Sequence, residues 1–317
     1  MIDDKAAGTR QLFIELIESK ELAMKDVPEA IAIAKISPSA GQWQNFINTL
    51  LLWFGSLTLA FGVIFFVAAN WQEVGRMVKF AIVEGAILIA MILNMKFRHK
   101  EVIRQATLLI VIILVGALMA LFGQTYQTGA DPWQLFLNWA LLTTPWVLIS
   151  RFSVIWLIWL GLLNLSISLY YQTFGGYFNI AWVAFGFNTA ALVIWQGSVS
   201  KFSWLNMTWA INLLGFISGA LALNLFVRSL FNDEPSGLIV WGLWAGFTFY
   251  VYRYRILNLF MLAVWSVAIL VAANALLIRI LPGFFEAGTL MLLTIVTIGL
   301  GTYFTVWLKS LNKVNHA

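Results

Sequence analysis

The stretch that decides the fold is 122–151, which reads FGQTYQTGADPWQLFLNWALLTTPWVLISR. A polar turn stands here between two long apolar runs, and Asp131, Pro132 and Trp133 open the second run. Aspartate is favoured at a helix N-cap because its carboxylate accepts the free amide hydrogens of the first turn, and proline at the first helical position loses no hydrogen bond. The stretch therefore predicts two helices joined by a polar loop.

The composition on both sides of this stretch is that of a membrane protein. Of the 317 residues, 61% are hydrophobic and 10% are charged, whereas a soluble domain carries about 25% charged residues. Apolar runs of about 20 residues, the length that crosses a bilayer, recur from Phe46 almost to the end of the chain. The first run follows a long charged segment, which does not fit a cleavable signal peptide. We therefore predict an all-α polytopic membrane protein.

The distribution of Lys and Arg predicts how many helices cross the membrane. Cytoplasmic loops carry the excess of positive charge. With the N-terminus inside, ten apolar spans place 15 of the 19 Lys and Arg residues in the cytoplasmic loops and the two termini, and 4 on the opposite side. This alternation predicts ten transmembrane helices with both termini in the cytoplasm, within a membrane domain of residues 44–317. The spans are 46–69, 77–95, 105–122, 133–150, 152–171, 177–196, 204–230, 237–252, 256–278 and 287–308.

The charged segment 1–43 is predicted to form a short cytoplasmic amphipathic helical hairpin. Leu12, Phe13, Leu16 and Ile17 lie on one apolar face at helical spacing. The segment holds seven acidic and five basic residues, so its charge is nearly balanced and it is not a nucleic-acid-binding arm. Its apolar face must pack on the partner helix or on the membrane domain.

The predicted outer loop, residues 123–131, contains no Lys or Arg. Its polar side chains include Gln124, Tyr126 and Gln127, and it ends at Asp131. These side chains could line an outward-facing polar pocket. A well-built turn in which Asp131 only caps the next helix explains the same residues, and both interpretations are open at this point.

The fourth span continues the polar pattern. Gln134, Asn138 and Pro145 follow at spacings of four and seven residues, so they share one helix face. Pro145 removes the helical hydrogen bond to the carbonyl of Leu141 and is expected to bend or loosen the helix. A polar stripe beside a free carbonyl is typical of a transporter site. The alternative is that the amides hold neighbouring helices together.

Glu84 is the only acidic residue well inside any of the ten spans. A carboxylate in the bilayer is costly and indicates a functional site. Lys79 lies five positions earlier, on nearly the opposite side of the helix, so no local ion pair is expected. The alternative is that Glu84, which lies near the outer end of its span, reaches headgroup water.

Small and amide residues also share faces on three spans, where helix packing is the first expectation. These faces are Gly55, Gly62 and Ala69; Thr208, Asn212, Gly215, Gly219 and Ala222; and Thr294, Thr297 and Gly301.

The sequence predicts no cofactor and no metal site. The two histidines, His99 and His316, lie in a predicted cytoplasmic loop and in the C-terminal tail. Neither an intramembrane histidine metal site nor a Ser-His-Asp triad can therefore be assembled. The chain has no cysteine and no Walker-type loop. An enzyme is the least supported class of function.

Two sequence segments, together with the charged N-terminal segment, resemble a known family. They are AANW at 68–71 and FGQTYQTGADPWQLFLNWALLTTPW at 122–146. The chain resembles the bacterial membrane-protein family called domain of unknown function 2157, most closely over its first half. The resemblance implies a multi-pass protein of the bacterial inner membrane. It implies no catalytic residues, because the activity of the family is not established.

Two functions are open from the sequence. The first is transport or flipping of a small solute or lipid through a cavity near Glu84 and the outer loop. The candidate residues are Glu84, Gln124, Tyr126, Gln127, Asp131, Gln134, Asn138 and Pro145. The second is a non-transporting assembly or sensor protein, which docks a membrane or periplasmic protein through the outer loop and the cytoplasmic hairpin.

Overall fold

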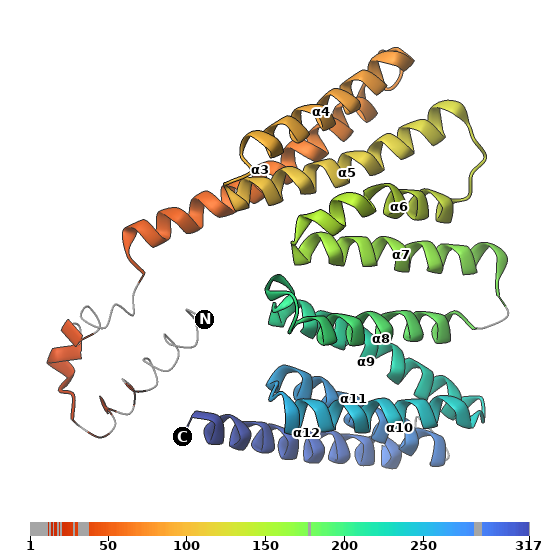
Figure 1. Cartoon of the computed structure of the whole chain (residues 1–317). Coiled ribbons are helices and arrows are strands. Elements are labelled where there is room, and N and C mark those ends of the chain that lie inside the picture. Colours follow the sequence, from red (N-terminus) through yellow and green to blue (C-terminus); the bar gives the residue numbers. More distant parts are fainter. Residues whose placement is uncertain are drawn as a thin grey trace. The chain divides into compact units, whose positions relative to one another are not determined.

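The structure, a computed structural model, describes residues 38–176, 179–281 and 287–316, and in the N-terminal segment Leu12, Ile14, Leu16, Ile17, Ser19, 21–27, Glu29 and Ala30. All regular structure among these residues is helical (Figure 1). The long helices are α3 (Ala40–Ala69), α4 (Arg76–Lys96), α5 (Glu101–Tyr126), α6 (Pro132–Ser150), α7 (Ser153–Phe174), α8 (Ile180–Ser198), α9 (Thr208–Phe231), α10 (Pro235–Tyr250), α11 (Leu259–Ile280) and α12 (Ala287–His316). The short ones are η1 (Met24–Asp26), η2 (Ser203–Leu205) and the π-helix η3 (Val251–Arg255).

Each predicted span corresponds to one long helix, but only eight of the described helices are long and apolar enough to cross a membrane. The two others are α6 and α10. Helix α6 has 19 residues, and its polar residues, such as Gln134 and Asn138, lower its hydropathy. Helix α10 has 16 residues, although it continues directly into η3. The all-helical membrane architecture is therefore confirmed, whereas the count of ten crossings stays a prediction.

Most of the predicted hairpin in 1–43 lies outside the described residues. Leu12, Ile14, Leu16 and Ile17 are helical, and η1 follows. Helix α3 begins earlier than the predicted span because Ser39 and Gln42 form a capping box. The Ser39 hydroxyl accepts from the Gln42 amide (3.3 Å), and the Gln42 side chain accepts from the Ser39 amide (2.8 Å).

The chain divides into two compact units. The first comprises the described residues up to Val74 together with Gly85–Val111, and the second comprises Gly75–Glu84 and the described residues from Ile112 to Asn315. Both candidate sites described below belong to the second unit. Its central helix is α9, which contacts α8, α10 and α11.

Small residues explain why α9 can be central. Gly215 lies against Met261 of α11, and Gly219 lies against Trp244 of α10. Ala222 is fully buried. The small-residue face predicted for the seventh span is therefore confirmed as a packing face at Gly215, Gly219 and Ala222, whereas Thr208 at its start is exposed. The face predicted for the first span is not formed within the described residues, because a Cβ at Gly55 or Gly62 would meet no atom within 4 Å.

Consecutive helices of the second unit run antiparallel, so the connections alternate between its two ends (Figure 1). One end, which we name the basic end, holds Arg151 between α6 and α7, Lys201 between α8 and α9, and Arg253 and Arg255 before α11. The opposite end holds the α5–α6, α7–α8 and α9–α10 connections.

Candidate functional site

A pocket of about 460 Å³ lies between the end of α5 and the first two turns of α6, at the opposite end. We name it the α5–α6 pocket. Its polar lining residues are Gln124, Thr128, Asp131, Gln134 and Asn138. The structure thus brings together four of the eight residues that the sequence predicted as a site, and adds Thr128.

Helix α5 ends later than the sequence predicted. Gln124 and Tyr126, which were assigned to the loop, belong to its last turn. Gln127 adopts a left-handed conformation (φ 45°), and the Thr128 amide donates to the Gly123 carbonyl (3.4 Å). This is the geometry of a Schellman helix end. It leaves only 127–131 as loop, and the Gln127 side chain does not line the pocket.

Asp131 precedes α6 as its N-cap residue and Pro132 is the first helical residue, as predicted, but the carboxylate makes no capping hydrogen bond. The backbone carbonyl of Asp131 already accepts the Gln134 amide (3.0 Å), and Pro132 has no amide hydrogen to offer. The predicted side-chain cap is therefore wrong. The carboxylate lines the pocket instead, without an ion-pair or hydrogen-bond partner among the described residues.

The amides of the α5–α6 pocket do not hold helices together. Within the described part of the chain, the side chains of Gln124, Gln134 and Asn138 form no hydrogen bond. The amides of Asn164 on α7 and Asn188 on α8, in contrast, bond to each other reciprocally (3.2 and 2.7 Å). Helix-joining amides therefore exist in this protein, and those of the α5–α6 pocket are not among them.

Glu84 does not line this pocket. It is exposed on α4, whereas Lys79 is buried, so the two residues lie on different sides of the helix as predicted. Glu84 does not line the second pocket described below either, so the predicted cavity that joins Glu84 to the outer loop stays a prediction. Among all the residues that the structure describes, no group of three or more His, Asp or Glu side chains is arranged to hold a metal ion.

Tyr126 has a packing role beside the pocket. Its ring lies 6.1 Å from that of Phe80 on α4 and 4.8 Å from that of Phe122, measured between ring centroids. The Arg76 guanidinium lies 5.6 Å from the Tyr126 centroid, within the range of a cation–π interaction. These contacts join the start of α4 to the end of α5.

Pro145 lines neither this pocket nor the one described next. Helix α6 continues through it to Ser150. The Thr144 hydroxyl and the Trp159 indole of α7 both donate to the Ala140 carbonyl (2.8 and 3.0 Å). The polar groups near the proline therefore serve the packing of α6 on α7, and the predicted bend or loosening of α6 at Pro145 stays a prediction.

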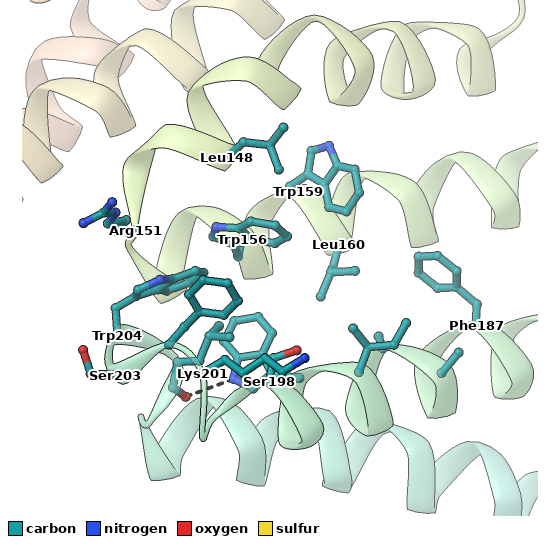
Figure 2. A pocket seen from close by; sticks show the side chains of 16 residues that line it. Leu148, Arg151, Trp156, Trp159, Leu160, Phe187, Ser198, Lys201, Ser203 and Trp204 are labelled. Carbon is teal, nitrogen blue, oxygen red and sulfur yellow. Dashed lines mark hydrogen bonds between the residues drawn. The ribbon is translucent and has the colours of Figure 1, made fainter.

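A larger pocket, of about 910 Å³, lies between α6, α7, α8 and η2 at the basic end (Figure 2). We name it the α6–α8 pocket. Its wall is mainly aromatic and aliphatic, and the only charged residues among its lining are Arg151 and Lys201. Figure 2 shows Arg151 near Trp156 and Trp204, and Phe187 farther along the pocket. The aromatic lining residues are Trp156, Trp159, Phe187, Trp195, Phe202 and Trp204.

Hydrogen bonds fix the walls of the α6–α8 pocket. The Trp195 indole donates to the Leu205 carbonyl (3.1 Å), and the Ser153 hydroxyl donates to the Trp204 carbonyl (2.9 Å). These bonds hold η2 against α7 and α8. The indole nitrogen of Trp156 is buried without a partner among the described residues. The walls of the pocket around η2 are therefore fixed by hydrogen bonds within the protein.

Arg151 occupies an unfavourable backbone conformation at the end of α6. Its φ is 47° and its ψ is 39°, a left-handed conformation that costs a non-glycine residue about 1 kcal/mol. Glycine would relieve this strain but would remove the charge from the pocket. Neither Arg151 nor Lys201 forms an ion pair with any described residue, so both charges are available to a ligand.

The α6–α8 pocket opens at the lateral surface of the second unit. Leu148, Ile194 and Phe202 line the pocket and are also 60%, 68% and 50% exposed. They come from α6, α8 and the α8–α9 connection. Apolar side chains exposed on membrane-type helices are expected to face acyl chains.

Comparison with known proteins identifies the first part of the chain. Residues 26–156 match the family described as Predicted membrane protein (DUF2157). The resemblance predicted from the sequence is thus confirmed over α3 to α6 and the first turn of α7. No curated protein and no solved structure matches the chain.

The DUF2157 match contains the whole α5–α6 pocket and, in the α6–α8 pocket, Leu148, Arg151 and Trp156. Lys201 and Trp204 lie beyond the matched residues. The function of the family is not established, so the match supports a membrane protein and assigns no role to either pocket.

Sequence reasoning missed the α6–α8 pocket. It used Arg151 and Lys201 only in the count of basic residues on each side of the membrane, and it assigned no role to the tryptophans around them. The available signal was the grouping of Trp156, Trp195 and Trp204 around these two charges, which the predicted topology places on one side of the membrane.

Proposed function

We propose that this protein binds an anionic lipid of the cytoplasmic leaflet in the α6–α8 pocket, as a lipid-handling protein of the bacterial inner membrane. The observation that carries the proposal is the combination of Arg151 and Lys201 with an aromatic pocket that opens laterally. Basic pockets between membrane helices on the cytoplasmic side suit anionic headgroups. A phospholipid has an anionic headgroup, which Arg151 and Lys201 can bind, and acyl chains, which the aromatic wall can contact.

The headgroup supplies the binding free energy in this proposal. A guanidinium binds a phosphate through two parallel hydrogen bonds, and an ammonium binds it as a point charge. Moving an acyl chain from the bilayer into the pocket gains little free energy, because the bilayer is already apolar. Selectivity should therefore follow the charge of the headgroup.

The orientation required by this proposal has the basic end in the cytoplasm, with ten crossings and both termini inside. The cysteine-free chain allows a direct test. We expect a membrane-impermeant thiol reagent to label Thr128→Cys in intact cells, and to label Arg98→Cys only after permeabilisation. The reverse pattern would contradict the orientation and would move the α6–α8 pocket to the other leaflet.

The double substitution Arg151→Ala and Lys201→Ala tests the binding of anionic lipid. Each basic residue near an anionic lipid surface contributes about 1 kcal/mol, so we expect a loss of about 2 kcal/mol, or about 30-fold in affinity. The measurement is competition between phosphatidylglycerol and phosphatidylcholine for the purified protein, read by native mass spectrometry.

The matched control for this experiment is Arg253→Ala with Arg255→Ala. It removes the same charge from the same end of the second unit, outside the α6–α8 pocket. We expect this control to keep the preference for phosphatidylglycerol. An equal loss in both double variants would mean that only the general charge of the basic end matters, and the pocket would play no part.

The assembly or sensor function stays a prediction. It depends on the cytoplasmic hairpin, most of which lies outside the described residues, and on the outer loop, which is short and shares its polar residues with the α5–α6 pocket.

A further inference from the structure

We infer that the α5–α6 pocket is a second binding site, which takes the primary ammonium group of a small amine or of an aminophospholipid headgroup. It lies at the opposite end of the second unit from the α6–α8 pocket and shares no lining residue with it. The inference is therefore independent of the proposed function.

The charge of the pocket favours a cation. Asp131 is the only ionisable residue that lines it, and this half-buried carboxylate has no cationic partner in the described parts of the chain. The nearby Arg76 guanidinium lies over the Tyr126 ring and does not line the pocket. A partly desolvated carboxylate is stabilised by an opposite charge, which the ligand would supply.

The uncharged lining residues fit the hydrogen bonds of an ammonium group. Such a group has three donors and no acceptor. The amide oxygens of Gln124 and Gln134 and the hydroxyl of Thr128 can accept them, while the Asn138 amide lies farther along α6, where it can contact the rest of the ligand. None of the three amides is engaged elsewhere in the described structure. Asp131 and Asn138 are separated by roughly 10 Å along α6, which leaves room for a short carbon chain beyond the ammonium.

The helix start itself does not explain the cluster. Pro132 provides no amide, and the Gln134 amide is bound by the Asp131 carbonyl (3.0 Å), so the carboxylate is not held in place as a cap. Helix packing does not explain the cluster either, because its three amides form no hydrogen bonds between helices like those that join Asn164 and Asn188. A ligand in the α5–α6 pocket would engage the carboxylate and the three amides together.

The test compares ethanolamine with ethylene glycol, which has a similar size and no ammonium. Calorimetric titration of the purified full-length protein should show binding of ethanolamine and at least tenfold weaker binding of ethylene glycol. Asp131→Asn should weaken ethanolamine binding at least tenfold, and Asn138→Leu should weaken it about threefold. Glu84→Gln is the matched control, since it removes an exposed carboxylate outside the pocket, and it should bind like the parent protein.

A parallel arm distinguishes the source of the ammonium group. Nanodiscs containing phosphatidylethanolamine or phosphatidylcholine are compared by native mass spectrometry of the released protein. Retention of phosphatidylethanolamine that Asp131→Asn abolishes identifies the lipid headgroup, and binding of free ethanolamine alone identifies a soluble amine. Unchanged binding by Asp131→Asn, equal binding of ethylene glycol, or no binding of either amine by the parent protein would overturn the inference.

Discussion

Replacement of Gly237 by alanine is expected to destabilise the second unit by about 3 kcal/mol. Gly237 lies in the first turn of α10, where its amide donates to the Ser229 hydroxyl of α9 (3.0 Å). A Cβ at this position would collide with that hydroxyl and with the backbone carbonyl of Leu225. Backbone atoms cannot rotate away as a side chain can, so the α9–α10 hairpin must open.

Gly242→Ala is the matched control on the same helix. A Cβ at Gly242 would meet no atom within 4 Å, and alanine is favoured over glycine in a helix interior by about 1 kcal/mol. We expect Gly242→Ala to be neutral or stabilising. The measurement is thermal unfolding in detergent, followed by circular dichroism. Equal melting temperatures for the two alanine variants would contradict the close packing of α10 on α9.

Replacement of Ala190 by tryptophan is expected to abolish the binding of anionic lipid. Ala190 lies on α8, lines the α6–α8 pocket and is exposed there. An indole at this position fills space that the lipid requires, without entering the buried core of α8. We expect the amount of phosphatidylglycerol retained through purification to fall more than tenfold, with little change in thermal stability.

Val193→Trp is the control for this substitution. Val193 is on the same helix and is 56% exposed, but it does not line the pocket. The same indole placed there should leave lipid retention unchanged. If Ala190→Trp retained as much phosphatidylglycerol as Val193→Trp, the lipid would have to bind elsewhere on the protein.

Hydropathy predicted the helices well because each apolar run is separated from the next by a short polar or charged connection. It failed at helix ends that are polar. The apolar run before the outer loop stops at Phe122, but Gln and Tyr are compatible with a helix. Backbone hydrogen bonding therefore continues to the left-handed residue Gln127. Hydropathy could not register this last turn.

The candidate sites were predictable only where their residues are close in sequence. Gln134 and Asn138 share a helix face one turn apart, beside the loop that holds Asp131. Their sequence spacing therefore predicted that these three residues line one pocket. The position of Glu84 outside that pocket depends on how α4 packs, which no local pattern encodes. The α6–α8 pocket depends on η2 folding back onto α7, where Ser153 bonds to the Trp204 carbonyl.

The most direct test of lipid binding in the α6–α8 pocket is a cryo-electron microscopy structure of the protein in phosphatidylglycerol nanodiscs. Lipid binding in this pocket predicts headgroup density within about 4 Å of the Arg151 guanidinium, the reach of an ion pair, with an acyl chain running along Trp156 into the pocket. A pocket without lipid density, or one that holds a chain whose headgroup lies away from both Arg151 and Lys201, would contradict it.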